Sequence, residues 1–259
     1  MLSSLAELAS YRELLRNLVA RDLKVRYRNS VLGFFWCLAN PLMMMVVFTV
    51  VFTILMKNDI PNYAVFVLSG VLAWNLFSTA LGGAIQSIVQ NSSLVMKVYF
   101  PREVLPLSVV LANGVNFLFA LIVLFALIFV SGVRLGPSLL LLPVILLIQL
   151  AFTAGLALLL SALTVFYRDV GIIMETGLLA WFFLTPVFYR IEDLVPDYAR
   201  LMYVVNPMAS IISAYRDVLY KGGMPALDFL ARTGATSLVV LAVGYWVFRR
   251  LAPRFGEEL

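Results

Sequence analysis

The strongest constraint in this sequence is a run of 24 residues, from Gly33 to Met56, that contains no charged side chain. An α-helix rises about 1.5 Å per residue, so a helix of this length would cross the roughly 30 Å hydrocarbon core of a membrane. The segment before the run has the opposite character, with six Lys and Arg side chains between residues 12 and 28. The chain is therefore predicted to pass from a membrane surface into lipid near residue 30.

The composition excludes an ordinary soluble protein. Hydrophobic residues make up 63% of the 259 residues and charged residues only 13%, whereas soluble domains carry about a quarter charged residues. The apolar segments are longer than the strands of a membrane barrel, which have about ten residues each, and helices satisfy their own backbone hydrogen bonds in lipid. We therefore predict an all-α integral membrane protein. The net charge is +5, and the Lys and Arg residues lie beside apolar spans. We therefore expect contact with the lipid bilayer and no nucleic acid partner.

Six stretches satisfy the length rule of about twenty apolar residues for a membrane-spanning helix. They cover residues 34–56, 63–89, 105–130, 138–166, 170–189 and 234–251. An even number of spans places both termini on one side. The termini and loops of that side hold 12 of the 19 Lys and Arg residues, whereas the short loops of the other side hold only Lys57 and Arg134. Because positive charge gathers on the cytoplasmic side, we expect both termini in the cytoplasm.

The chain is predicted to have two parts. Residues 1–30 form an amphipathic helix in the cytoplasmic membrane interface, with Leu8, Tyr11, Leu15, Leu18 and Val25 on its apolar face. Residues 31–259 form the six-span domain. The residues expected at the membrane interface are Arg21, Lys24, Arg26, Tyr27 and Arg28.

Small residues repeat at helical spacing in two of the predicted spans. Gly70, Ser78 and Gly82 lie in the second span, and Ala151, Gly155, Ala157 and Ser161 lie in the fourth. Small side chains let helix backbones approach closely in a membrane, so these positions are predicted to be helix contacts.

The segment 191–220, before the last span, is neither a typical solvated loop nor long enough in any apolar run to span. Asn206-Pro207 is typical of a helix start, with a capping side chain followed by a first-turn proline, and the helix is expected to run through Tyr220. Upstream, Thr185-Pro186 is expected to bend or end the fifth span. We predict short helices that dip back into the outer leaflet, with a plain extracellular cap as the alternative.

Several kinds of chemistry are missing. The sequence has no histidine, so we expect no metal site, and Glu175 is the only acid well inside a predicted span. A structural role for Glu175 near a helix start is favoured over a functional one. No phosphate-binding Gly-x-x-x-x-Gly-Lys-Ser/Thr loop occurs. The chain is therefore expected to need no cofactor and to hydrolyse no ATP itself.

One predicted cytoplasmic loop has the composition of a docking element. The loop Asn91 to Leu105, NSSLVMKVYFPREVL, contains adjacent aromatic residues that we expect to be exposed, a rigid proline and three charges. Protein interfaces favour aromatic anchors and Arg, so Phe100 and Arg102 are predicted anchors, and a locally packed turn is the alternative. The residues concerned are Lys97, Tyr99, Phe100, Pro101, Arg102 and Glu103.

Five segments together resemble the permease subunits of ATP-binding cassette exporters for cell-surface polysaccharides and teichoic acids. The segments are RDLKVRYRNSVLGFFWCLANPL at 21–42, VMKVYFPREVLPL at 95–107, YRDVG at 167–171, WFFLTPVFY at 181–189 and NPMASIISAYRDVLY at 206–220. The resemblance extends over nearly the whole chain. Asn40 departs from it, because many members of the family have Gln at that position.

The resemblance implies a homodimer in the bacterial cytoplasmic membrane, with two separate ATPase subunits that bind ATP and Mg. The basic N-terminal helix would be an interface helix, and loop 91–105 would be the coupling helix received by the ATPase. A second contact would come from Tyr167, Arg168 and Asp169. Residues 191–220 would be gate helices on the outer side.

The resemblance also implies that the first and fifth spans line the conduit between protomers, where ring faces can stack on sugars. The candidate conduit residues are Phe35, Trp36, Phe48, Phe52, Trp181, Phe182, Phe183, Phe188 and Tyr189. The implied substrate is a lipid-linked polysaccharide: an O-antigen, a capsule or a teichoic acid. The alternatives are a lipid or drug exporter of the same superfamily and an integral-membrane enzyme that modifies glycans.

Overall fold

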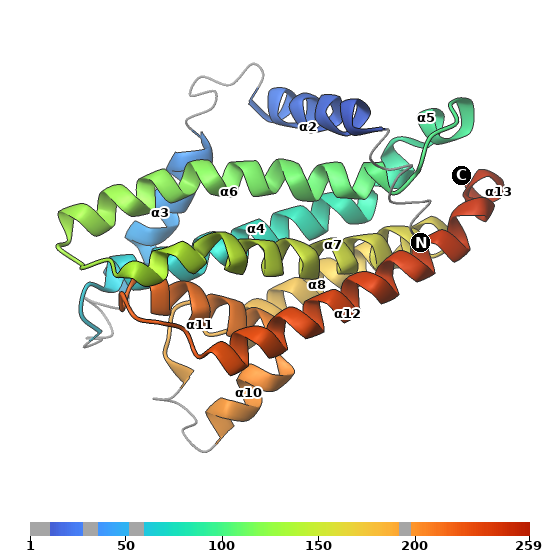
Figure 1. The fold of residues 1–259 in the computed structure, drawn as a ribbon. Coiled ribbons are helices and arrows are strands. Elements are labelled where there is room, and N and C mark those ends of the chain that lie inside the picture. Colours follow the sequence, from blue (N-terminus) through green and yellow to red (C-terminus); the bar gives the residue numbers. More distant parts are fainter. Residues whose placement is uncertain (1–10, 28–35, 52–59, 192–197) are drawn as a thin grey trace.

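The computed structural model describes residues 11–27, 36–51, 60–191 and 198–259 (Figure 1). Every regular element in these ranges is a helix, and none of these ranges contains a strand. The prediction of an all-α protein is therefore confirmed.

Four of the described helices are long and apolar enough to cross a membrane. They are α4 (Tyr63–Gln90), α6 (Val104–Val130), α7 (Leu142–Phe166), which continues the 3-10 turn η3 (Pro137–Leu141), and α12 (Leu227–Leu251). These helices match the second, third, fourth and sixth predicted spans. The helix α12 begins at Leu227, before residue 234, where the last span is predicted to start.

The other two predicted spans are covered only in part. The helix α3 (Trp36–Thr49) has 14 residues, and the remainder of the first span, residues 34–35 and 52–56, lies outside the described ranges. The helix α8 (Asp169–Leu184) has 16 residues, so the predicted end at residue 189 is wrong. Thr185 is extended, with φ −102° and ψ 131°, because a residue that precedes proline avoids the helical region. The expectation that Thr185-Pro186 ends this helix is confirmed.

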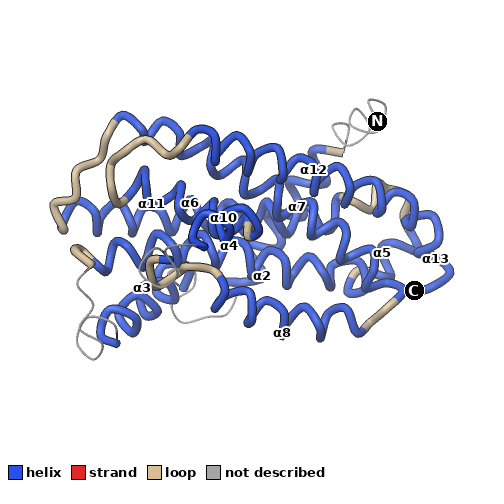
Figure 2. The backbone as a smooth tube through the Cα atoms, turned by 90° about the horizontal axis from the view of Figure 1, so that it is seen from below, coloured by secondary structure: helices blue, strands red, loops and turns tan. Residues whose placement is uncertain are grey.

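The helix α4 is the centre of the bundle. In its most apolar window 78% of the residues are buried, against 39%, 33% and 22% in the other three long helices. It packs against α3, α6, α7 and α8, and against α11 (Pro207–Leu219), as Figure 2 shows from below. The middle of α4 is therefore shielded from lipid by the protein itself.

Polar side chains inside the spans bind backbone carbonyl groups. The hydroxyl groups of Ser69 and Ser87 donate to carbonyls one turn earlier in α4, and that of Thr153 does the same in α7. The Nε2 group of Gln149, buried in α7, donates to the carbonyl of Ala73 in α4 at 2.6 Å. These bonds satisfy donors that would otherwise lose free energy in an apolar environment.

The helices α7 and α12 cross at close range. A Cβ atom at Gly155 would lie 2.6 Å from the backbone nitrogen of Leu241, and one at Gly244 would overlap the Gly155 carbonyl. The prediction of close packing is confirmed at Gly155, but it is wrong at Gly82, where a Cβ atom would meet nothing within 4 Å.

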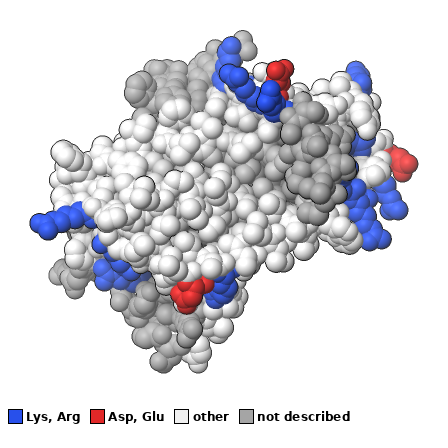
Figure 3. All heavy atoms as spheres, viewed as in Figure 1, with Lys and Arg blue, Asp and Glu red and all other residues white. Residues whose placement is uncertain are grey.

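Charged side chains gather toward the two ends of the bundle and over α2 (Arg12–Tyr27) on the face that Figure 3 shows. The middle of that face is uncharged. This distribution is the one expected for a protein whose central belt contacts lipid.

The basic helix α2 packs against α6 and is amphipathic (Figure 1). Leu18 is buried, with Tyr11 and Leu15 packed beside it, whereas Arg21 and Lys24 face outward. Val25 departs from the predicted apolar face, because its side chain is exposed. Residues 1–10 and 28–30 of the predicted helix lie outside the described ranges.

Among the described residues of the segment before the last span are the helices α10 (Ala199–Val205) and α11. The Asn206 side chain accepts hydrogen bonds from the backbone nitrogens of Met208 and Ala209, so the predicted cap is confirmed. Most of α11 is buried against α4, α7 and α12. Residues 192–197 of the predicted gate segment lie outside the described ranges.

We predict that Gly155→Ala lowers the stability of the helix bundle, because the added methyl group meets the backbone of α12 rather than a side chain that could turn away. Overpacking of this kind costs about 1–3 kcal/mol. Thermal unfolding in lipid nanodiscs would show a lower Tm. The matched control is Gly82→Ala, where the methyl group enters open space and Ala favours the helix by up to about 1 kcal/mol. An equal loss of Tm in both variants would contradict this account of the crossing.

Candidate functional site

The loop between α4 and α6 begins with a short helix, α5 (Ser92–Lys97), and continues through Pro101. The two aromatic residues of this loop have opposite environments. Tyr99 is 89% exposed, whereas Phe100 is only 6% exposed. The expectation that both rings are exposed is therefore wrong for Phe100. Its ring belongs to a small hydrophobic cluster with Val95, Leu105 and other residues of the neighbouring helices.

The cluster around Phe100 joins the loop to the end of the chain. After α12, the chain continues as the 3-10 turn η5 (Ala252–Arg254) and the short helix α13 (Phe255–Glu258). The ring of Phe255 is fully buried, 5.4 Å from the ring of Phe248 and 6.1 Å from that of Phe166. The last turn is therefore packed into the cluster on which the loop rests.

Arg102 also connects the loop to this last turn. Its guanidinium donates to the carbonyl of Ala252 and lies 5.8 Å from the centre of the Phe255 ring. Arg102 is partly buried, and Glu103 beside it is buried. Of the predicted anchors, Phe100 and Arg102 thus hold the loop in place within this chain. Among the predicted docking residues of this loop, Lys97 and Tyr99 have exposed side chains, and Pro101 is half-buried.

The exposed side of the loop combines apolar and charged groups. Met96, Val98 and Tyr99 are exposed beside Lys97. A cavity of about 350 Å³ is lined by the Val98–Glu103 segment, by Arg249 of α12 and by Pro253 of η5. An exposed tyrosine among apolar side chains and cations is the composition that protein interfaces favour.

The second predicted contact lies at the turn from α7 to α8. Tyr167, Arg168 and Asp169 all have exposed side chains there. The turn follows the end of α7 and is on the same end of the bundle as α5 and α13, because α4 and α7 both run toward that end (Figure 1). Both predicted docking segments therefore share one end of the molecule.

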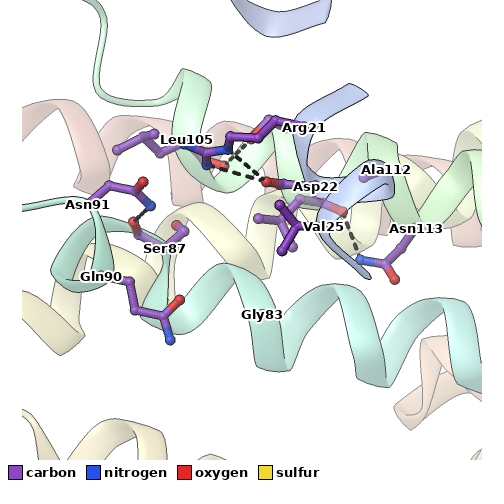
Figure 4. Close-up of a pocket in the computed structure, with 12 residues that line it drawn as sticks. Arg21, Asp22, Val25, Gly83, Ser87, Gln90, Asn91, Leu105, Ala112 and Asn113 are labelled. Atoms are coloured by element: carbon purple, nitrogen blue, oxygen red, sulfur yellow. Dashed lines mark hydrogen bonds and ion pairs between the residues drawn. The ribbon is translucent and has the colours of Figure 1, made fainter. Parts of the chain in front are cut away.

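A polar pocket of about 520 Å³ lies near this end, between α2, α4 and α6 (Figure 4). Arg21 and Asp22 of α2 form its upper edge and are paired with each other at 3.3 Å. Below them, the side chain of Asn91 donates to the carbonyl of Ser87 at 2.7 Å. Gln90, Ser108 and Asn113 complete the polar lining.

Most residues of this pocket were missed by the sequence reasoning. It assigned Arg21 to the membrane interface and Val25 to the apolar face of the same helix, and it named Asn91 and Leu105 only as the ends of the docking loop. The polar residues Ser87, Gln90 and Asn91 lie at positions i, i+3 and i+4 near the end of an apolar span. This spacing places them on one helix face, and it is the signal that could have identified them.

The predicted conduit aromatics form part of one cluster in this chain. The ring of Phe188 lies 5.7 Å from the rings of Phe48 and Phe182, and 5.2 Å from that of Tyr189. Phe183 contacts the cluster at 5.5 Å but has an exposed side chain. Trp36 is exposed on α3, whereas Phe35 and Phe52 lie outside the described ranges.

Trp181 is on the inner side of this cluster. Its ring packs at 5.1 Å against Phe77 and at 6.2 Å against Phe152, and its Nε1 group donates to the Asn206 side chain at 2.9 Å. The same Asn206 oxygen caps α11. Trp181 therefore links α8 to α11 within one chain, a structural role that the sequence reasoning did not predict.

The remaining predicted positions lie on α2, on α8 or outside the described ranges. Arg21 and Lys24 are exposed on α2, Arg26 and Tyr27 belong to its last turn, and Arg28 lies outside the described ranges. Glu175 is exposed on α8. Within the described ranges, no group of three His, Cys, Asp or Glu residues is arranged to hold a metal ion.

We predict that Phe255→Ala loosens the loop 98–103, because the mutation removes the ring on which Arg102 rests. Replacing a buried Phe with Ala costs about 3–5 kcal/mol. Trypsin should then cleave faster after Lys97 and Arg102 in the purified protein. The control is Glu257→Ala, an exposed position in the same short helix. Unchanged cleavage in Phe255→Ala would show that the last turn does not hold the loop.

Comparison with known proteins gives a consistent set of relatives. The family model for the ABC-2 type transporter matches residues 13–220. The O-antigen export system permease protein RfbA of Myxococcus xanthus is 39% identical over 264 residues, and the match covers 100% of both chains. Two proteins with the same name from Klebsiella pneumoniae are each 34% identical over 250 residues, and each match covers 95% of both chains.

Proposed function

The chain belongs to the ABC-2 type transporter family, and we propose that it is the permease subunit of an exporter that moves lipid-linked O-antigen polysaccharide across the bacterial cytoplasmic membrane. The observation that carries this proposal is the 39% identity over the full length to a protein named as an O-antigen export permease. A match of this extent includes the loops and the last turn as well as the spans.

The proposed energy source is a separate ATPase subunit, which would bind ATP and Mg. The sequence has no phosphate-binding loop of its own. The exposed tip of loop 91–105 supports a docking role, because Tyr99 projects from a loop that Phe100 and Arg102 hold firmly against the bundle. A rigid support lowers the entropy cost of docking an exposed anchor. The exposed turn at Tyr167 would be the second contact.

We propose that two copies of the chain assemble with two ATPase subunits. The support is the uncovered face of α8, where Ile172, Leu179 and Phe183 are exposed at helical spacing. The described residues therefore leave this face of α8 largely uncovered. A second copy packed against this face would enclose the aromatic cluster of Phe48, Phe182 and Phe188 near a conduit between protomers, with Phe183 nearest the partner.

The proposed topology has six spans with both termini in the cytoplasm. It adds α3 and α8 to the four long helices and assigns α10 and α11 to the outer side, as helices that return into the membrane without crossing it. The buried position of α11 among three spans supports this assignment, because an outer cap would leave more of its surface exposed.

The export function can be tested in cells that lack their own O-antigen permease. Expression of this chain with its ATPase is expected to restore polysaccharide at the cell surface. Tyr99→Ala should weaken co-purification of the ATPase by about tenfold or more, as loss of an aromatic hot spot does, and should reduce export in parallel. The control, Tyr198→Ala, removes an exposed tyrosine from the segment proposed for the outer side. Absence of surface polysaccharide with the unaltered chain and its ATPase would contradict the proposed function.

The topology predicts opposite accessibility for two loop positions. Cys37 is the only native cysteine, so it is first replaced by Ser. Lys97→Cys should then react with an impermeant maleimide only from the cytoplasmic side, and Gly223→Cys only from the outer side. Reaction of both cysteines from one side would rule out the six-span arrangement.

A further inference from the structure

A second polar pocket lies at the end of the bundle opposite to loop 91–105. Its volume is about 460 Å³, and it is formed by the first turn of α4, by α10, by the end of α11 and by the segment that follows α8. This volume is in the range of small-ligand sites. The pocket is lined by Phe66, Arg190, Tyr203, Ser213, Arg216, Tyr220 and Lys221.

All the charged residues that line this pocket are cations. Three of the seven lining residues are cations, and no lining residue is an acid. One acid lies next to the pocket, because Asp217 accepts from the Lys221 ammonium at 2.8 Å. Three cations and one acid leave two net positive charges among these described residues. Glu192 and Asp193, which follow Arg190 in the sequence, lie outside the described ranges.

The wall of the pocket is fixed by Arg216. This buried guanidinium donates to the carbonyls of Phe66, Pro186 and Val187 and lies 3.6 Å from the centre of the Phe66 ring. Gly70 makes this arrangement possible, because a Cβ atom there would lie 2.8 Å from the Val187 oxygen. The pocket therefore does not need to form when a ligand arrives.

Arg190 is the cation best placed to meet a ligand. Its side chain is half-buried in the pocket wall, and it makes no hydrogen bond or ion pair with any residue that the structure describes. The hydroxyl group of Tyr220 donates to the carbonyl of Pro61 at 2.7 Å, which leaves its oxygen able to accept. The hydroxyl group of Ser213 adds a group that can donate or accept.

We infer that this pocket binds a phosphate group of a membrane lipid at the outer end of the bundle. Arg presents a planar set of donors that matches phosphate oxygens, and Lys adds a point charge. The phosphate has two possible sources: the diphosphate of a polyprenyl carrier or the phosphodiester of an anionic phospholipid. The assignment to the outer side rests on the proposed function. A site there would hold the headgroup as the lipid leaves the permease.

The test measures whether a lipid occupies the pocket. The full chain is bound to its ATPase in phosphatidylcholine nanodiscs. Cys37 is replaced by Ser, and Ser213→Cys then places the only cysteine of the chain in the pocket wall. The rate of labelling by N-ethylmaleimide is compared after addition of polyprenyl diphosphate or of phosphatidylglycerol to the bilayer. Slower labelling with only polyprenyl diphosphate supports the carrier as the source. Slower labelling with phosphatidylglycerol supports the phospholipid.

The protection should depend on the pocket cations. Arg190→Gln is expected to weaken the protection from labelling about fivefold, which corresponds to about 1 kcal/mol for one cation near a membrane surface. Lys221→Gln should weaken the protection as well. The matched control is Arg134→Gln, which removes an exposed cation from the same end without lining the pocket. An unchanged Tm shows that each variant is folded.

Absence of protection by either lipid, or equal protection in Arg190→Gln and Arg134→Gln, would overturn the inference. This readout does not require transport. If the chain restores O-antigen export but shows no Arg190-dependent protection, only the inference about the pocket is contradicted. A chain that shows the protection but never exports O-antigen contradicts the proposed function.

Discussion

The absence of water in the hydrocarbon core is the constraint on which this structure depends. Every backbone amide in lipid must be bonded inside the protein, which makes helices the only regular elements available to such apolar segments. The same constraint explains the polar side chains within the spans. Gln149 bonds to the backbone of α4, and Thr153 bonds within its own helix. With α4 buried at the centre, the outer helices are free to present apolar faces to lipid or to partners.

The two ends of the bundle expose different chemical groups. At one end, Phe100 and Phe255 pack into one cluster, so that the loop after α5 and the last turn of the chain support each other while Tyr99 remains exposed. At the other end, Arg216 joins α4, α11 and the segment after α8 around a basic pocket. Both ends thus combine a buried anchor with exposed groups of defined chemistry. A force applied by an ATPase at the loop would reach the opposite end of the bundle through the central helix α4 and its packed neighbours.

Much of the fold could be predicted from the sequence, because long apolar runs and positive loops are properties of the chain alone. Four spans and the cap at Asn206 follow from such local signals. The environment of Phe100 could not be predicted, because its burial depends on Phe248 and Phe255, which are far away in the sequence. The position of Trp181 could not be predicted for the same reason: an aromatic residue within a predicted span is compatible with contact to lipid, conduit or core. Its packing against Phe77 and its bond to Asn206 place it inside the chain. The fifth span was predicted to extend to residue 189 because apolar composition continues past Thr185. The Thr185-Pro186 pair, which was also expected to bend or end the span, marks the actual end of the helix.

The central claim is that this chain moves a lipid-linked polysaccharide across a membrane with energy from a separate ATPase. The most direct test reconstitutes the purified chain and its ATPase into sealed liposomes that contain the lipid-linked O-antigen, with the ATPase on the outer surface. An impermeant glycan-degrading enzyme enclosed in the lumen then reports the arrival of polysaccharide. The account predicts luminal degradation that requires ATP, the ATPase and this chain together. Degradation without ATP, or none when all three are present, would contradict it.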